Sequence, residues 1–479
     1  MINGKSRVII EHVQPTVDGG LYPAKRTLGE RVDVAASIFG DGHDHIRAKV
    51  LYKKKGVTEW SEVEMKSSVN DEWIGSFYAS ELGKYTFTIQ AWIDHLDTWY
   101  DGFKKKVNAK VDVHVELKEG AIFLKSLAAK DTALLSVARK LESSDYAAAV
   151  REVMSDSFAK IVQDHPLQEH ETKLEKEFEI MVEHKKALYS TWYEFFPRSS
   201  SLQPGKHGTF QDCIRLLPRI AAMGFDILYF PPIHPIGKIN RKGKNNNVRA
   251  QKDEPGSPWA IGSEEGGHKS ILPELGTLDD YKKLIAEAKK HNIDIGFDLA
   301  FQCAPDHPYV KEHPHWFRQR PDGSIQYAEN PPKKYQDIYP FNFETDQWKE
   351  LWDELKSVIL YWIEQGVTIF RVDNPHTKPI PFWHWVIGEV NREFPEVIFL
   401  AEAFTRPKIM ASLAKVGFTQ GYTYFTWRVT KQEITEYMNE LVHGPSRNYF
   451  RPNFWPNTPD ILPFHLQHQK ENTSPGPTA

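Results

Sequence analysis

The stretch Gly366-Val-Thr-Ile-Phe-Arg-Val-Asp-Asn-Pro-His-Thr-Lys-Pro379 decides the fold of this chain. It begins with an apolar, β-branched run that ends in Arg371, and Asp373 follows two positions later. Asn374-Pro375 then stops the strand, and a helical pattern of apolar residues begins near Phe382. We therefore predict a buried strand that delivers an arginine and a carboxylate at its carboxyl end, before a crossover helix. In a (β/α)₈ barrel, catalytic groups lie at that end of the strands.

Strands and helices alternate from residue 187 onward, and this alternation implies parallel pairing of the strands. The predicted strands are Tyr189–Phe196, Phe225–Phe230, Ile293–Ala300, Val367–Arg371, Val397–Glu402, 417–425 and Phe450–Phe454. Residues 187–479 therefore predict an α/β catalytic domain of the (β/α)₈ TIM-barrel type, truncated before strand eight. A long irregular loop insert occupies residues 303–345, and Glu471–Ala479 is predicted to be a disordered linker.

The residues that precede this domain predict two further regions, so the chain is multidomain. Residues 1–112 contain short alternating runs separated by turn residues, which is typical of an immunoglobulin-like β-sandwich. Residues 113–186 change to a helical period, and we expect this helical segment to serve packing or dimerisation.

The composition describes a soluble globular protein and excludes several classes of function. The 479 residues are 40% hydrophobic and 26% charged, with a net charge of −4, which argues against a nucleic-acid or anionic-membrane binder. No run of about 18 apolar residues is present, so no membrane span is expected. The two cysteines, Cys213 and Cys303, fit neither a disulfide framework nor a metal-binding spacing, which suits a reducing, cytoplasmic location.

Two carboxylates occupy equivalent places at the ends of neighbouring predicted strands. Asp373 and Glu402 are separated by about one β-α-β unit, so we expect them to face each other. Facing carboxylates carry out glycosidic chemistry, at a separation of about 5–5.5 Å in retaining enzymes. Arg371 would keep Asp373 ionised. Either carboxylate alone could equally be an ordinary helix cap, and it is the pair with the arginine that favours catalysis.

These residues resemble the α-amylase superfamily, glycoside hydrolase family 13. The segments that carry the resemblance are Asp298-Leu-Ala-Phe-Gln302, Phe370-Arg-Val-Asp373, Leu400-Ala-Glu402 and Phe454-Trp-Pro-Asn-Thr-Pro-Asp460. The resemblance implies that Asp373 is the nucleophile and Glu402 the proton donor. It also implies that Asp460 stabilises the transition state.

Departures from the amylase pattern point to one subfamily. Gln302-Cys303 stands where amylases carry Asn-His, Pro459 replaces a histidine, and His376 is one place short of its usual position. Long runs such as Ala328–Tyr339 and Val372–Pro379 are instead similar to maltosyltransferases that use α-maltose 1-phosphate. This resemblance implies glycogen biosynthesis by a homodimer. A maltosyl unit would pass to the non-reducing end of an α-1,4-glucan, with release of phosphate and retention by double displacement. No metal or organic cofactor is implied.

The resemblance also implies which residues contact the donor. These are Lys242, Gln302, Asp337 and Asn374, while Asn330, Lys333 and Tyr335 are candidate phosphate contacts. The loop 238–247 supplies further cations for a phosphate ester, although taken alone it would be read as a solvated, mobile segment. Two other functions stay open from the sequence, namely an α-glucan hydrolase and a truncated, non-catalytic glucan-binding protein.

Overall fold

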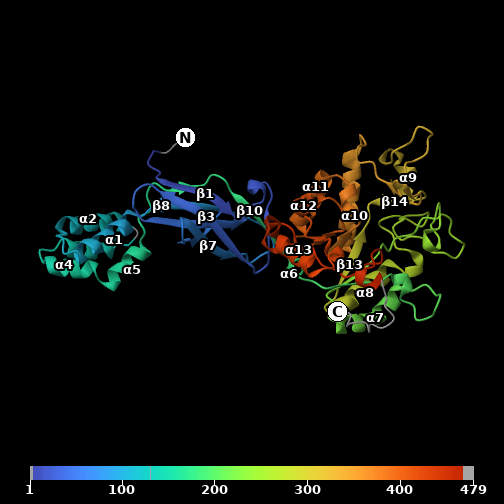
Figure 1. Cartoon of the computed structure of the whole chain (residues 1–479), viewed down its shortest axis with the longest axis horizontal. Helices are drawn as coiled ribbons and strands as arrows, with labels where there is room; N and C mark the ends of the chain where they lie inside the picture. The colour runs from blue at the N-terminus through green and yellow to red at the C-terminus, as the bar shows by residue number, and fades with distance from the viewer. Residues whose placement is uncertain (1–3, 130, 468–479) are drawn as a thin grey trace. The chain divides into compact units, whose positions relative to one another are not determined.

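The computed structural model describes residues 4–129 and 131–467 (Figure 1). The chain divides into two compact units. The first contains the residues before Lys25 together with Gly29–Ser80 and Lys84–Ile180, and the second contains Lys25–Leu28, Glu81–Gly83 and the chain from Met181 onward. The predicted linker Glu471–Ala479 lies outside the described residues.

Two β-sheets come from the N-terminal part of the chain, with strand orders β1-β3-β7-β6 and β2-β10-β8-β4-β5, β9 pairing with β8. Their strands are β1 (Val8–Gln14), β2 (Ala24–Thr27), β3 (Arg31–Gly40), β4 (Ile46–Lys54), β5 (Ser61–Glu64), β6 (Lys66–Ser67), β7 (Glu72–Tyr78), β8 (Gly83–Ile93), β9 (Thr172–Lys173) and β10 (Phe178–Glu183). In β3, Val32, Val34 and Ile38 are buried and alternate with more exposed residues, so one face of this strand packs inward. The predicted β-rich region is therefore present, and its immunoglobulin-like topology stays a prediction.

Helices of the first unit pack around one apolar core. They are α1 (His95–Asn108), α2 (His114–Leu127), α3 (Leu134–Leu141), α4 (Tyr146–Val153) and α5 (Asp156–Asp164). The first of them corrects the sequence analysis, because it lies inside the predicted β-region 1–112. Asp94 follows β8 directly and caps α1, since its side chain accepts hydrogen bonds from the backbone N–H groups of Leu96 and Asp97.

The end of the predicted helical segment 113–186 is also corrected. Strand β10 occupies Phe178–Glu183, where a helical segment was expected. Phe178, Ile180 and Val182 are buried with period two, which is the pattern of a strand. The charged residues before this short run hid that alternation.

The second unit is built on a seven-stranded sheet in chain order, β11-β12-β13-β18-β19-β20-β21. All neighbouring strands in it are parallel. These strands are β11 (Trp192–Glu194), β12 (Ile227–Phe230), β13 (Asp294–Leu299), β18 (Ile369–Val372), β19 (Ile398–Ala401), β20 (Gln420–Tyr422) and β21 (Pro452–Asn453). Each coincides with a predicted strand and is shorter. The closed eight-stranded barrel stays a prediction.

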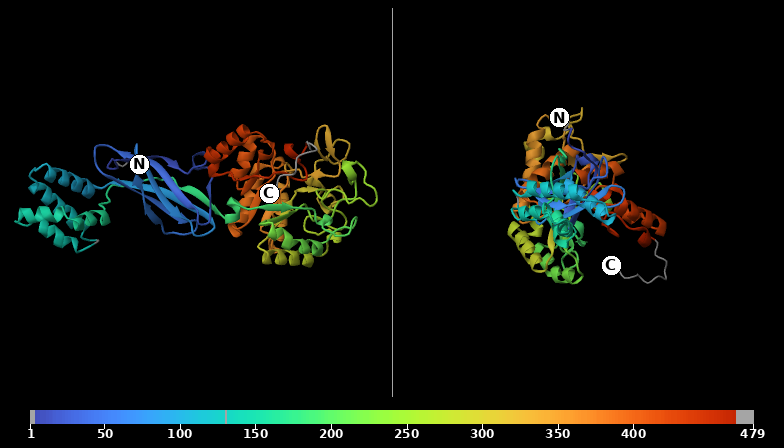
Figure 2. Two further views of the ribbon diagram at one scale, coloured as in Figure 1. Left: turned by 60° about the horizontal axis from the view of Figure 1, so that its bottom comes forward. Right: turned by 90° about the vertical axis from the view of Figure 1, so that its left-hand side faces the viewer.

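Helices lie before, between and after these strands along the chain, and Figure 2 shows the ribbon from two further directions. They are α6 (Lys185–Leu188), α7 (Phe210–Ala222), α8 (Leu278–Lys290), α10 (Trp348–Glu364), α11 (Ile380–Glu393), α12 (Pro407–Lys415), α13 (Lys431–His443) and α14 (Phe464–Gln467). Capping boxes precede α7, α8 and α13, with Thr209, Thr277 and Thr430 as the N-cap residues. No helix within residues 4–129 and 131–467 has both the length and the apolarity to span a bilayer.

The insert 303–345 is less irregular than predicted. It contains α9 (Pro308–Glu312), the 3₁₀ turn η5 (Pro314–Trp316), the hairpin of β15 (Ala328–Asn330) with β16 (Lys333–Tyr335), and β17 (Tyr339–Pro340), which pairs with β14 (Gln302–Cys303). The large side chains Trp316 and Phe341 are buried, so the insert has apolar contacts of its own.

Candidate active site

The register of three neighbouring strands brings the predicted carboxylates to one end of the sheet. In β18, Arg371 is aligned with Asp298 of β13 on one side and with Leu400 of β19 on the other. Because the strands are parallel and in register, Asp373 and Glu402 leave their strands at the same level. The structure therefore brings Arg371, Asp373 and Glu402 together, as the sequence predicted.

Arg371 is the centre of this cluster. Its Nη1 donates to Asp298 Oδ2 at 3.0 Å and to Asp373 Oδ1 at 2.9 Å, and its Nη2 lies 3.8 Å from Glu402 Oε1. The guanidinium is buried, and the rings of Tyr229 and Tyr422 lie 5.7 and 5.9 Å from it. One fixed cation thus sets the positions of three carboxylates.

Glu402 is the carboxylate whose environment suits a proton donor. Burial raises the pKa of Glu402 to about 7, against the lowering effect of Arg371 and with help from the charge of Asp373. Its Oε2 accepts a hydrogen bond of 3.1 Å from the backbone N–H of Asn374. A carboxyl group that titrates near neutral pH can both give and take a proton.

Asn374 connects the two carboxylates through an uncommon backbone conformation. Its φ of 43° and ψ of 52° are left-handed, which asparagine tolerates better than most residues. This turn directs its backbone N–H to Glu402, while its side-chain Nδ2 donates to Asp373 Oδ2 at 3.3 Å. Lys378 Nζ donates to the carbonyls of Asp373 and Asn374 and holds the turn in place.

The sequence analysis missed several side chains of this cluster. Glu194 ends β11 beside Tyr229, and burial raises its pKa to about 7, with Asp460 raising it further and Arg371 lowering it. The hydroxyl of Tyr229 donates to Asp298, as does Trp259 Nε1 at 3.3 Å. The rule that selected Asp373, a carboxylate at the carboxyl end of a strand, could have found Glu194 as well.

Asp460 lies on an exposed loop, and its placement differs from that of the other carboxylates. Its backbone N–H donates to Thr458 Oγ1 at 3.2 Å. Its charge raises the pKa of both Glu194 and Glu402, so it lies within electrostatic range of the cluster. Its role as stabiliser of a transition state stays a prediction.

Besides Asn374, the predicted donor contacts are Lys242, Gln302 and Asp337, and each of these is buried or linked by hydrogen bonds to the carboxylate cluster. Lys242 is buried, and its Nζ donates to Gln336 Oε1 at 2.9 Å. Burial raises the pKa of the neighbouring Asp337, and the charge of Lys242 lowers it. Gln302 donates through Nε2 to the carbonyl of Trp259 at 3.2 Å. Because Trp259 also donates to Asp298, Gln302 is coupled to the carboxylate cluster.

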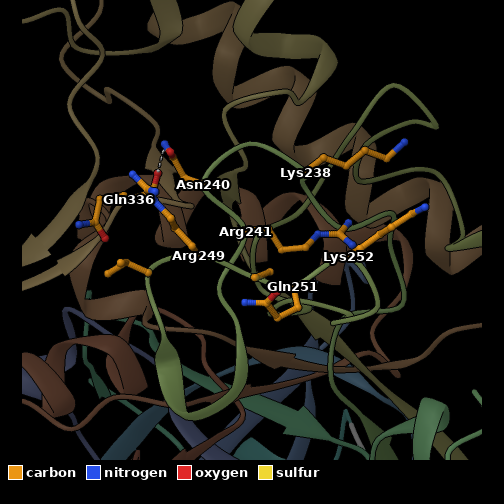
Figure 3. A pocket seen from close by; sticks show the side chains of 9 residues that line it. Lys238, Asn240, Arg241, Arg249, Gln251, Lys252 and Gln336 are labelled. Carbon is orange, nitrogen blue, oxygen red and sulfur yellow. Dashed lines mark hydrogen bonds between the residues drawn. The ribbon is translucent and has the colours of Figure 1, made fainter.

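An open, basic cavity of about 730 Å³ is lined mainly by residues of the segment that contains Lys242 (Figure 3). It is lined by Lys238, Asn240, Arg241, Val248, Arg249, Ala250, Gln251, Lys252 and Gln336. Lys238 forms an ion pair with Glu264, and Arg241 donates to the carbonyls of Gly237 and Ile236 at 2.7 Å each. The predicted cationic loop therefore forms a concave polar surface that an anionic group could enter.

The candidate phosphate contacts lie on a separate hairpin. Asn330 pairs with Lys333 across β15 and β16, and both side chains are exposed. Tyr335 is 37% exposed. Within the described part of the chain, no hydrogen bond joins these three residues to Asp373 or Glu402. Their role as phosphate contacts stays a prediction.

A family model described as "Alpha-1,4-glucan:maltose-1-phosphate maltosyltransferase, domain N/S" matches residues 6–184. The maltosyltransferase of that name from Chlorobaculum tepidum is 52% identical over 476 residues, which cover 97% of this chain and 70% of the relative. This chain belongs to the α-1,4-glucan:maltose-1-phosphate maltosyltransferase family. The relative of the same name from Methylacidiphilum infernorum is 49% identical, over 98% of this chain and 71% of its own.

Membership of the maltosyltransferase family confirms the resemblance found in the sequence. Among solved structures, an α-amylase from Lactobacillus plantarum matches with a TM-score of 0.44 and 26% identity, over 54% of this chain and 60% of its own.

Buried histidines lie close to the active site of this maltosyltransferase family member. His268 donates through Nε2 to the carbonyl of Ala300 at 3.0 Å, so its Nδ1 accepts from His307 Nε2, also at 3.0 Å. His307 Nδ1 in turn accepts from the backbone N–H of Tyr309. All four ring nitrogens are therefore used, and burial lowers the pKa of His268 to about 4. Cys303 lies within reach of both rings, and the three residues could in principle hold a metal ion. Because the ring nitrogens are already hydrogen-bonded, the two histidines instead act as a neutral part of the core.

Proposed function

We propose that this chain transfers a maltosyl unit from α-maltose 1-phosphate to the non-reducing end of an α-1,4-glucan, with release of phosphate. The activity is that of a retaining glycosyltransferase, and its relatives carry the corresponding name. The observation that carries the proposal is the buried cluster in which Arg371 holds Asp373 and Glu402 at the ends of adjacent strands.

In the first step, Asp373 attacks the anomeric carbon of the maltosyl unit. The bond from this carbon to the phosphate oxygen breaks, and the electron pair leaves with phosphate, which receives the proton of Glu402. A β-linked maltosyl ester of Asp373 forms. Asp460 faces the developing positive charge of the sugar ring.

In the second step, Glu402 acts as the base. It removes the proton from the 4-hydroxyl of the acceptor, whose oxygen attacks the same anomeric carbon and displaces Asp373. Two inversions give net retention. The environment of Glu402, which raises its pKa to about 7, suits a group that works in both directions.

Recognition of a phosphate ester is supported by cationic and polar residues on the loops of the second unit. Lys242 is buried beside Asp337, and Asn374 lies between the two catalytic carboxylates. The basic cavity and the hairpin with Lys333 offer further donors to an anion. We assign donor binding to Lys242, Gln302, Asp337 and Asn374, and phosphate contacts to Asn330, Lys333 and Tyr335.

The products of the reaction test this function. Incubation with α-maltose 1-phosphate and glycogen should release phosphate in step with glucan lengthening. Free maltose without lengthening would identify a hydrolase, and glycogen binding without turnover would identify a binding protein.

Further properties belong to the same proposal. We assign the (β/α)₈ barrel to the region from residue 187, the β-sandwich to 1–112 and the packing segment to 113–186, with the corrections given above at α1 and β10. A homodimer is supported by Val115 and Ile122, which lie on one face of α2 and are 65% and 63% exposed. The two free, buried cysteines suit the cytoplasm, where glycogen biosynthesis would take place.

A further inference from the structure

A second histidine cluster lies at the surface, and it contains none of the residues of the proposed catalytic site. His313 and His315 flank the start of the 3₁₀ turn η5 in the insert 303–345, and Glu350 lies in the first turn of α10. His313 Nδ1 is 3.3 Å from Glu350 Oε1, and His315 Nε2 is 3.8 Å from Glu350 Oε2. One atom from each of the three residues fits within 4.8 Å of the others.

These separations are close to those of metal ligands. Bonds of about 2.0–2.2 Å from zinc to histidine nitrogen and carboxylate oxygen place neighbouring ligand atoms roughly 3.4 Å apart in a tetrahedron. Two imidazoles and one carboxylate are a common protein ligand set for zinc and related ions. Small side-chain rotations would bring all three atoms to bonding distance, because the side chains are 30–51% exposed.

One of the ligands is already held in orientation. The His313 ring stacks on the buried ring of Trp316, with centroids 3.8 Å apart and an interplanar angle of 5°. This stacking directs Nδ1 toward Glu350 and reduces the entropy lost on metal binding. The buried pair His268 and His307 differs, because its four ring nitrogens are consumed by protein hydrogen bonds.

We propose that His313, His315 and Glu350 bind a divalent transition-metal ion of the zinc class, with water completing the coordination. The ion would join the insert that carries Asp337 to α10, the helix that leads into the nucleophile strand β18. It would stabilise the insert and take no part in the transfer reaction. The proposal is thus independent of the proposed function.

Titration of the full chain with zinc against a chromophoric chelator tests this site. We expect one ion per chain in the wild type, and at least a tenfold loss of affinity in His315→Ala. His443→Ala, which removes an exposed histidine from the end of α13, is the matched control and should bind as the wild type does. Equal zinc affinity in the wild type and in His315→Ala would overturn the proposal.

Two further variants separate loss of a ligand from loss of packing. His313→Phe keeps an aromatic ring against Trp316 and removes the nitrogen, while Glu350→Gln keeps the size of the side chain and removes its charge. Both should lose the zinc-dependent rise in thermal midpoint that the wild type shows, and should retain phosphate release without zinc. An undiminished rise in both variants would place the ion elsewhere and refute the site.

Discussion

Two halves of the active site are built by different means. The catalytic half, Arg371, Asp373 and Glu402, lies on or directly after strands, is largely buried, and is joined by hydrogen bonds and ion pairs. The proposed donor half lies on loops and on the short strands β14, β15 and β16, where Lys242 is buried but Lys333 on its hairpin is exposed. In the proposed site, strand register therefore fixes the groups that would make and break bonds, and the segments between the main strands would supply the groups that select the donor.

Removal of the nucleophile should have the largest effect. Asp373→Ala leaves no group to form the covalent ester, so we expect phosphate release to fall at least about 10⁴-fold. Phosphate release from α-maltose 1-phosphate with glycogen measures this loss. Asp353→Ala, at an exposed position on α10, is the control carboxylate and should be unaffected. Substantial activity in Asp373→Ala would refute the nucleophile assignment.

The acid/base carboxylate should show a large and step-specific effect. Phosphate is a good leaving group, so Glu402→Gln should slow the first step less than the second, which needs a base. We expect turnover to fall about 10²–10⁴-fold. Rapid mixing should show a burst of one phosphate per site, followed by a stalled maltosyl ester detectable by mass spectrometry. Slow phosphate release without a burst would argue against the role of Glu402 as the base.

The pH dependence of stability should also report Glu402. Its pKa is raised from the usual 4.5 to about 7, so the native state holds a proton that the unfolded state releases between these values. The free energy of unfolding contributed by this group therefore falls as pH rises from 4.5 to 7. Glu402→Gln should be more stable than the wild type above pH 7, and the two should converge near pH 4.5 in denaturant titrations.

Changes in the donor half should affect substrate affinity more than turnover. Lys242→Met removes a buried cation that contacts Gln336 and lies near Asp337, and should raise KM for the donor roughly tenfold or more with a smaller change in kcat. Steady-state kinetics with varied donor concentration gives both values. A fall in kcat alone would move Lys242 into the catalytic half.

The exposed hairpin should give the smallest effect. Lys333→Ala should raise KM for the donor by a few fold, because an exposed cation contributes little Coulomb energy and is screened by salt. Lys334→Ala is the matched control, since neighbouring residues of β16 point to opposite faces. If both variants behave alike, the hairpin acts through net charge and Lys333 makes no specific phosphate contact.

Prediction from sequence succeeded where local pattern determines position. The run that ends in Arg371 is a buried strand, and parallel register then places Asp373 beside Glu402. It failed at α1 and β10, where neighbouring turns or charges obscured the period of the apolar residues. It could not place Lys333 or Tyr335, because nothing in a hairpin's sequence specifies how it lies against the rest of a domain.

Glu194 shows a further limit. Its strand was predicted as Tyr189–Phe196, whereas the observed β11 ends at Glu194, so the strand-end rule would have selected Glu194 only with the observed end of the strand. The tertiary fold brings Arg371 to it from a distant strand.

The crowding of several buried carboxylates around Arg371 has a consequence for how the site gains and loses protons. Burial raises the pKa of Glu194, Asp298 and Glu402 to about 7, so the free site holds protons at neutral pH that isolated carboxyl groups would have lost. In the proposed mechanism, the proton that Glu402 gives to phosphate in the first step is replaced from the acceptor hydroxyl in the second. Each turnover would therefore return the site to its starting protonation state, with Glu402 protonated again when the next donor binds.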